Sequence, residues 1–400
     1  MRLRSSVRAM SALLAAALAV PSIGVGYKFG GRAGIVLCLL IAIAGVVLLV
    51  RWGYPRLVGR LSDRSAHTLM LATLALLTVG LFVVYPLNQA HVFGAGNDEA
   101  DGMNVAASNL LHGRYLYLGH TWAGNPIVPW PGSVFLAVPF VLLGNSAYQV
   151  VFWLGTLYLV LDWYLERRAA AALALIWSII VLSPIFLDYF WSGSDVVAAA
   201  MFVTAFSIIT VKTGQQASRW HLVAAGLLGV ALSSRANFAL AYPAVMIALY
   251  RARGIMPAVV SASTTVISFS LVTLPFLVAS PANFTPLTSR TLMLQAVAST
   301  APTLVVGLSL AAIVVVILVG RSWDWLANAS LILAVPIAAV LVLAFQMRGF
   351  GAFNWYPDYG ITYEFFAAIL AWKLILQKSE VPRRVTAPQT EPAIAAYSRE

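Results

Sequence analysis

The sequence predicts an all-α, polytopic transmembrane protein with about twelve spans. Of its 400 residues, 61% are hydrophobic and the mean hydropathy is +0.87. Only 10% are charged, whereas soluble chains carry about 25%. A soluble globule cannot bury that much apolar surface, but a bilayer absorbs it in spans of roughly 20 residues each.

Twelve apolar runs give the expected spans in chain order. They are Met10–Gly26, Gly34–Val50, Thr68–Tyr85, Ala147–Tyr164, Ala169–Leu187, Val196–Val211, His221–Ser234, Phe238–Tyr250, Met256–Ala279, Thr303–Gly320, Leu326–Phe345 and Ile361–Ile375. The first run follows an Arg-rich terminus, which also fits a cleaved signal peptide. Because a second span follows closely, we expect the first helix to be retained.

Three segments depart from this simple pattern. Ser133–Gly144 is apolar but too short to cross a bilayer, so we expect a re-entrant or juxtamembrane helix in the first long outer loop. The short runs His221–Ser234 and Phe238–Tyr250 form either two thin spans or a broken pair. Arg235 lies between them, where a charge is costly unless it has a function.

The basic residues indicate the orientation. A net charge of +11 suggests nucleic-acid binding at first sight, but the Lys and Arg residues lie in short loops between apolar runs instead of on one polar face. With the N- and C-termini inside, most of them face the cytoplasm. We therefore expect no nucleic-acid partner. The single cysteine, Cys38, excludes an intrachain disulfide.

The chain reads as one transmembrane domain, residues 1–377, with an outer loop at 87–132. Residues 378–400 are polar and predicted to form a disordered cytoplasmic tail. The outer loop contains Asp98, Glu99 and Asp101 just beyond a span. Acids there can cap the following helix, but capping does not require so long a loop, and long loops are usually functional.

The outer loop resembles that of the GT-C superfamily, integral-membrane glycosyltransferases that use polyprenyl-phosphate-linked sugars. Asp98-Glu99, Leu111-His-Gly-Arg-Tyr115, Pro129-Trp-Pro131 and the short apolar helix Ser133–Gly144 follow the family pattern in order. Leu182-Ser-Pro184 followed by Asp195 is similar to its second outer loop, and the Gly-rich segment from Ala225 to Arg235 to its half-helix ending in Arg. Two spans precede the loop-bearing helix where the family usually has one, which leaves the subfamily open.

The resemblance implies a multi-pass enzyme of the bacterial plasma membrane, of the mannosyltransferase or aminoarabinose-transferase kind. Such an enzyme moves a sugar, with inversion, from a polyprenyl-phosphate donor to a lipid, glycan or protein hydroxyl on the outer face. A carboxylate must take the proton of the acceptor hydroxyl. Asp98 is the expected base and Glu99 the fallback, while Asp101 supports or caps.

Further residues are expected to bind substrate or its phosphate. The leaving phosphate needs positive charge, which Arg or a divalent cation supplies. These binding residues are Arg235, Arg348, Asp195, Asp188, His112, Tyr115 and Trp355. Alternatively, the Arg residues snorkel to the membrane interface or pair with outer acids, and the aromatic residues belong to the aromatic belt of the membrane. If a metal such as Mg²⁺ or Mn²⁺ binds, Asp98 and Asp195 are the expected ligands.

Two other function classes remain open on the sequence. One is a twelve-span secondary transporter or lipid-linked-sugar flippase, which Arg235 and the short helix pair also fit. The other is a non-catalytic assembly or polymerase-type membrane protein. Against the transporter, the two halves do not echo each other, and the acids gather at the outer surface.

Overall fold

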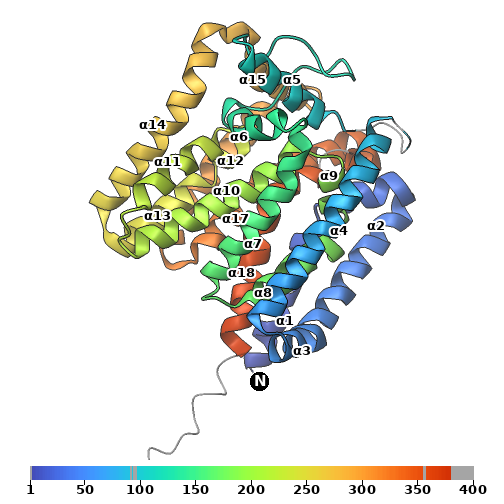
Figure 1. Ribbon diagram of the computed structural model, residues 1–400, viewed down its shortest axis with the longest axis vertical. Coiled ribbons are helices and arrows are strands. Elements are labelled where there is room, and N and C mark those ends of the chain that lie inside the picture. Colours follow the sequence, from blue (N-terminus) through green and yellow to red (C-terminus); the bar gives the residue numbers. More distant parts are fainter. Residues whose placement is uncertain (1, 91, 93–96, 355–356, 380–400) are drawn as a thin grey trace, which may run out of the picture.

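The computed structural model describes residues 2–90, 92, 97–354 and 357–379, and these residues form an all-helical protein (Figure 1). The extended pairing within them is one isolated bridge between His120 and Pro126. The predicted all-α class is therefore confirmed. Trp355 and most of the predicted tail lie outside the described residues.

The first half of the chain contains the helices that carry the predicted outer loop. They are α1 (Arg2–Ala19), α2 (Ile23–Leu48), α3 (Tyr54–Arg60), α4 (Asp63–Gln89), α5 (Glu99–Leu111), α6 (Pro131–Leu142), α7 (Gln149–Tyr164), α8 (Ala169–Leu182) and α9 (Pro184–Trp191). A π-helical turn, Leu49–Gly53, joins α2 to α3, and a 3₁₀ turn, Ser146–Tyr148, precedes α7.

The second half begins with the most buried long helix. Its helices are α10 (Asp195–Gln215), α11 (His221–Leu232), α12 (Ala236–Ala239), α13 (Tyr242–Arg253), α14 (Ile255–Ala279), α15 (Thr285–Gln295), α16 (Ala301–Leu318), α17 (Trp325–Arg348) and α18 (Ile361–Ser379). The short 3₁₀ segments are Pro281–Asn283, Gly320–Ser322, Gly349–Asn354 and Pro357–Gly360.

Seven helices in the described residues are long and apolar enough to cross a membrane, or up to nine if each of two bent pairs is one span. The multi-pass membrane character is thus supported, while the count of about twelve is not confirmed. Three of the expected spans are short: α11 and α13 have 12 residues each, and the apolar part of α1 is Arg8–Ala19. Twelve helical residues rise about 18 Å, well under the roughly 30 Å hydrocarbon core.

The two bent pairs mark where continuous apolar sequence does not give a straight helix. The axis turns by 103° between α6 and the helix ending at Tyr164, and by 86° between α8 and α9. Gly144 adopts a φ of +117° at the first bend, which favours glycine. The Ser183–Pro184 junction makes the second, because proline disfavours helical backbone at the residue before it. The predicted short helix thus exists as α6 and turns away from the next span.

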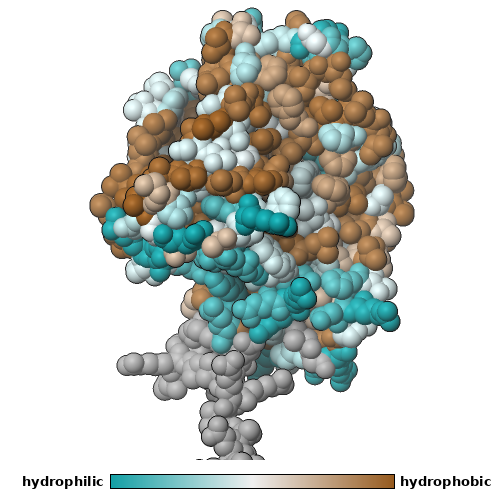
Figure 2. Space-filling view, turned by 60° about the vertical axis from the view of Figure 1, so that its left-hand side comes forward, coloured by the Kyte–Doolittle hydropathy of each residue, from teal (hydrophilic) through white to brown (hydrophobic). Residues whose placement is uncertain are grey.

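The core of the fold surrounds α10, almost all of whose residues are buried. α10 packs against α7, α11, α13 and α18, while α1 runs along α18 and α11 along α14. In Figure 1, α5, α6 and α15 lie at one end of the bundle and α3 with the N-terminus at the other. Figure 2 shows hydrophobic residues over much of the visible face, with hydrophilic residues gathered towards the lower end. An apolar belt of this kind suits a lipid environment.

Candidate functional site

The predicted outer loop places the Asp98 carboxylate against a turn of the same loop. Asp98 is the N-cap residue of α5, but its side chain makes no capping hydrogen bond. Its Oδ2 instead accepts hydrogen bonds from Thr121 Oγ1 and, at 2.9 Å, from Asn125 Nδ2. Asn97 provides the local cap, since its Oδ1 accepts from the Glu99 amide at 2.8 Å. Asp98 is therefore not explained by helix capping.

Glu99, Asp195 and Arg235 meet in one ionic cluster. Arg235 Nη2 lies 2.6 Å from Asp195 Oδ1 and 3.3 Å from Glu99 Oε1, and Arg235 Nε lies 3.3 Å from Asp195 Oδ2. The Arg235 and Asp195 residues are 4% and 1% exposed. The pair is bidentate, which is the strongest geometry for an Arg–carboxylate contact. Three segments far apart in the chain are thus tied together.

Local structure explains why each member points inward. Asp195 is the first residue of α10, and the N-cap Ser194 accepts from the Val196 amide at 3.1 Å. The Ser194 hydroxyl also donates to Glu99 Oε2. Arg235 has extended backbone between α11 and α12, with φ −156° and ψ 146°. Because the helix is broken between α11 and α12, the Arg235 side chain can face both carboxylates.

Burial and charge act in opposite directions in this cluster. Burial raises the pKa of Glu99, and the Asp195 carboxylate raises it further, while Arg235 opposes both effects. Burial alone would lower the pKa of Arg235, but the two carboxylates raise it above its ordinary value. Arg235 therefore keeps its charge, and burial makes Glu99 easier to protonate than an exposed glutamate.

The Pro-containing stretch of the outer loop packs against the segment that carries Arg235. The Trp130 amide donates to Ser234 O at 3.1 Å, and the Ser133 amide to Ser233 O at 3.2 Å. The Gly132 amide donates to Ser233 Oγ at 3.2 Å. The start of α6 and the end of α11 therefore lie in direct contact, although the sequence pointed to them separately.

The other predicted site residues are more dispersed. Tyr115 Oη donates to Phe276 O and Ser280 O at 3.1 Å each, which ties the loop to the end of α14. His112 is exposed with Nδ1 2.8 Å from Ser108 O. Arg348 is exposed and donates to Ala296 O at 3.1 Å. Asp188 is half-buried on α9, one short loop before Asp195. The prediction for Trp355 falls outside the described residues.

Four side chains of the site were not anticipated: Asn97, Thr121, Asn125 and Ser194. Ser194 carried a signal, because a serine directly before an acidic helix start is a common N-cap. Thr121 and Asn125 carried none, since isolated polar residues in a long loop do not reveal which carboxylate they contact.

The donor set fits an internal ion pair better than a metal centre. The carboxylates of Glu99 and Asp195 face a guanidinium, which takes the place that a cation would need. The described part of the chain contains no group of three or more His, Cys, Asp or Glu side chains that could hold a metal ion. We therefore derive no step through a metal.

Comparisons of the chain with protein-family models, with curated proteins and with solved structures gave no match. The family resemblance consequently rests on the sequence segments alone, and the site must be argued from its own geometry.

Proposed function

We propose that the protein is a glycosyltransferase of the bacterial plasma membrane. It would transfer a sugar from a polyprenyl-phosphate donor to a lipid, glycan or protein hydroxyl on the extracytoplasmic face. The observation that carries the proposal is the joining of the outer loop to Asp195 and Arg235 through Glu99. Ionisable groups are expensive in a membrane protein and mark functional sites by default. Here they fix the end of α5 that bears Asp98.

Asp98 is the proposed general base. Thr121 and Asn125 both bond to Oδ2 and so orient the carboxylate, and Oδ1 is the oxygen that would take the proton. In the transfer, the acceptor oxygen forms a bond to the anomeric carbon as its proton moves to Asp98. The bond from that carbon to the phosphate oxygen breaks, and the polyprenyl phosphate leaves. Direct displacement inverts the anomeric carbon.

The ionic cluster has a positioning role in this scheme. Because Arg235 is buried between two carboxylates, it holds α5, α10 and the α11–α12 junction in register. Its predicted phosphate contact stays a prediction, as does that of Asp195. The exposed cations Arg348 and Arg114 are the alternative sources of positive charge for the phosphate.

A transporter or flippase is the second candidate, and the same cluster favours it. Arg235 lies at the junction of the short helices α11 and α12, and discontinuous helices with ionisable residues line substrate paths in transporters. A transporter moves its substrate unchanged, so the two functions separate on whether the donor is consumed.

The test is an Asp98→Asn variant assayed in membranes with labelled polyprenyl-phosphate sugars. We expect transfer to fall by at least about 100-fold, the usual contribution of a general base. Asp101→Asn is the matched control, because Asp101 Oδ2 accepts from the Trp122 amide at 2.8 Å, and an asparagine oxygen can also accept that bond. If Asp98→Asn transfers sugar at the wild-type rate, Asp98 is not the general base. If the wild-type protein consumes no donor, the protein is not a glycosyltransferase and the transporter is favoured.

A further inference from the structure

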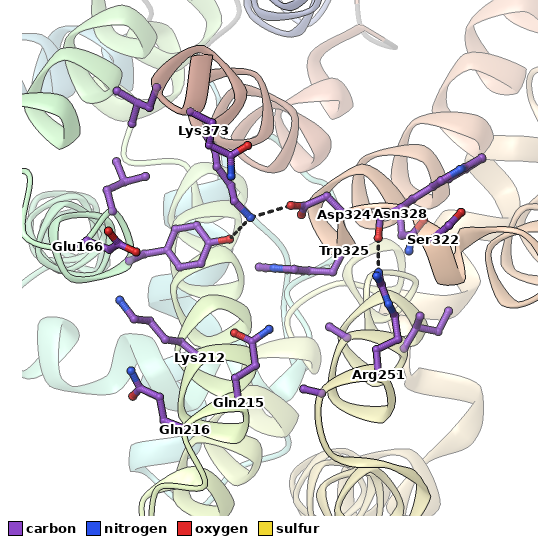
Figure 3. Close-up of a pocket in the computed structure, with 18 of the residues that line it drawn as sticks. Glu166, Lys212, Gln215, Gln216, Arg251, Ser322, Asp324, Trp325, Asn328 and Lys373 are labelled. Carbon is purple, nitrogen blue, oxygen red and sulfur yellow. Dashed lines mark hydrogen bonds and ion pairs between the residues drawn. The ribbon is translucent and has the colours of Figure 1, made fainter. Parts of the chain in front are cut away.

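A second polar site lies at the other end of α10 from Arg235. A cavity of about 880 Å³ opens there between the ends of α7, α10, α13 and α18 and the start of α17 (Figure 3). Because α10 has 21 residues, the two ends lie about 30 Å apart. The cavity is therefore separate from the candidate catalytic site, and the predicted orientation places it on the cytoplasmic side.

The cavity has a surplus of positive charge. Its lining includes four cationic side chains, Arg168, Lys212, Arg251 and Lys373, against two carboxylates, Glu166 and Asp324. One pair is internally neutralised, since Lys373 Nζ lies 2.7 Å from Asp324 Oδ2. Lys212 and Arg251 instead donate to backbone carbonyls, those of Trp163 and Trp323. A carbonyl satisfies a hydrogen bond but does not balance a charge. Glu166, the remaining carboxylate of the lining, acts on Lys212, so the cations still outnumber the acids and an anionic ligand would offset the excess positive charge.

The rest of the lining is suited to a polar ligand. Gln215, Gln216, Ser322 and Tyr164 add donors and acceptors around the cations. Asn328 is fully buried, its Nδ2 donates to Gly320 O at 2.9 Å, and its Oδ1 has no hydrogen-bond partner in the described residues. A buried carbonyl oxygen without a donor is costly. A ligand hydroxyl or a water could supply that donor.

Backbone strain is concentrated at the rim of the cavity. In the described residues, the non-glycine residues with positive φ are Glu166, Arg167 and Ala217, at +61°, +59° and +54°. They belong to the two loops that leave α7 and α10, and Glu166 itself lines the cavity. Such conformations cost free energy and occur preferentially at ligand clamps and functional sites. Both loops border the cavity, so its rim contains backbone conformations that cost free energy.

We propose that this cavity binds a phosphate-bearing ligand at the end of the bundle where the basic loops gather. The shared chemistry is a phosphate ester with a neighbouring hydroxyl: the phosphate contacts Lys212 and Arg251, and the hydroxyl reaches the polar amides. An anionic phospholipid headgroup and a soluble phosphate ester both present this chemistry. Basic sites between helices at the cytoplasmic face commonly hold anionic headgroups.

The experiment uses the full chain, purified in a neutral detergent, and two probes. Binding of glycerol 3-phosphate is measured by calorimetry, and retention of phosphatidylglycerol over phosphatidylcholine by native mass spectrometry. Arg251→Gln and Lys212→Gln are each expected to weaken binding about tenfold, the effect of losing one charged hydrogen bond. Gln216→Glu adds a negative charge at an exposed rim position and should weaken binding, while its place at the C-terminal end of α10 lowers stability by no more than about 1 kcal/mol.

Arg253→Gln is the matched control, because Arg253 is exposed on the same helix as Arg251 and does not line the cavity. Binding of glycerol 3-phosphate that is sensitive to the three variants identifies a soluble ligand class. Selective retention of phosphatidylglycerol with the same sensitivity identifies the lipid. If neither probe binds, or if the lining variants bind as well as Arg253→Gln, the proposal is wrong.

Discussion

Gly132 contacts Ser233 so closely that no side chain fits between the start of α6 and the end of α11. The Gly132 amide donates to Ser233 Oγ at 3.2 Å, and a Cβ built on Gly132 would lie 2.0 Å from Val230 O and 2.5 Å from Ser233 O. No real Cβ tolerates such distances to backbone atoms. Two residues after Ser233 comes Arg235, so this contact couples the start of α6 to the ionic cluster.

Gly132→Ala should therefore destabilise the protein. Overpacking of a close backbone contact costs about 1–3 kcal/mol, which we expect as a lower melting temperature of the purified protein. Gly307→Ala is the matched control: Gly307 is exposed in the middle of α16, and its Cβ would meet nothing within 4 Å. There alanine should be neutral or stabilising by up to about 1 kcal/mol. Equal melting temperatures for both variants would contradict the close approach.

Arg235→Gln should be among the most damaging single substitutions. It leaves the buried Asp195 and the half-buried Glu99 as neighbouring carboxylates without a counter-charge, and breaking a buried pair by removing one partner costs about 3–5 kcal/mol. The measurement is thermal unfolding, with expression level as a second readout. Arg348→Gln, at an exposed position, should change stability by no more than about 0.5 kcal/mol. If the two variants unfold together, the buried cluster does not hold the segments in place.

A variant that combines Glu99→Gln with Asp195→Asn tests whether Arg235 stabilises the protein through these two carboxylates. The neutral amides keep hydrogen-bond acceptors but remove both charges, so adding Arg235→Gln to that pair should cost less than adding it to the wild type. A double-mutant cycle on melting temperature measures this coupling. Additive effects would mean that Arg235 interacts with other groups.

Residue type and order drew attention to the three members of the ionic cluster, but as a base and as substrate-binding residues, not as partners of one another. Arg235, Asp195 and Glu99 stood out because charges are scarce in this chain, and scarcity makes each one informative. The bond from Asp98 to Thr121 and Asn125 could not be read in the same way. It depends on the tertiary path of the outer loop, which no local pattern encodes.

The span count shows a different limit of sequence reasoning. Ala169–Leu187 is one continuous apolar run, yet the helix breaks at Ser183–Pro184 and turns by 86°. Hydropathy averages over such a break, while Pro184 alone signals it. The runs that became α11 and α13 are mainly apolar, but each helix has only 12 residues. Composition indicates that a segment prefers a lipid environment, but the packing of the helices decides whether that segment crosses the membrane.

The raised pKa of Glu99 predicts a pH-dependent stability. Burial and Asp195 raise the pKa above its ordinary value of 4.5, so the folded state binds the proton more tightly than the unfolded state. The stability that this proton contributes is present below about pH 4.5 and is lost as the pH rises through the higher folded pKa. Glu99→Gln cannot lose a proton. Its melting temperature relative to wild type should therefore rise through that window and be flat outside it.

The measurement compares melting temperatures of wild type and Glu99→Gln in steps from pH 4 to pH 9. His112→Gln serves as the control for a substitution in the same loop, because His112 is exposed at the other end of α5. A difference that falls with rising pH would mean that Arg235 dominates and lowers the pKa of Glu99 instead.

Ala217→Gly should stabilise the protein, because Ala217 has a φ of +54° directly after α10. The Ser218 amide donates to Thr213 O at 3.0 Å and the Ala217 amide to Gly214 O at 3.2 Å, which is the helix-ending geometry that favours glycine at this position. Relief of the left-handed strain is worth about 1 kcal/mol, seen as a higher melting temperature. The same substitution at Ala311, exposed in the middle of α16, should lower stability by about 1 kcal/mol. Opposite signs at the two alanines are the expected result. If Ala217→Gly instead loses stability as Ala311→Gly does, the backbone at the rim of the basic cavity is not strained.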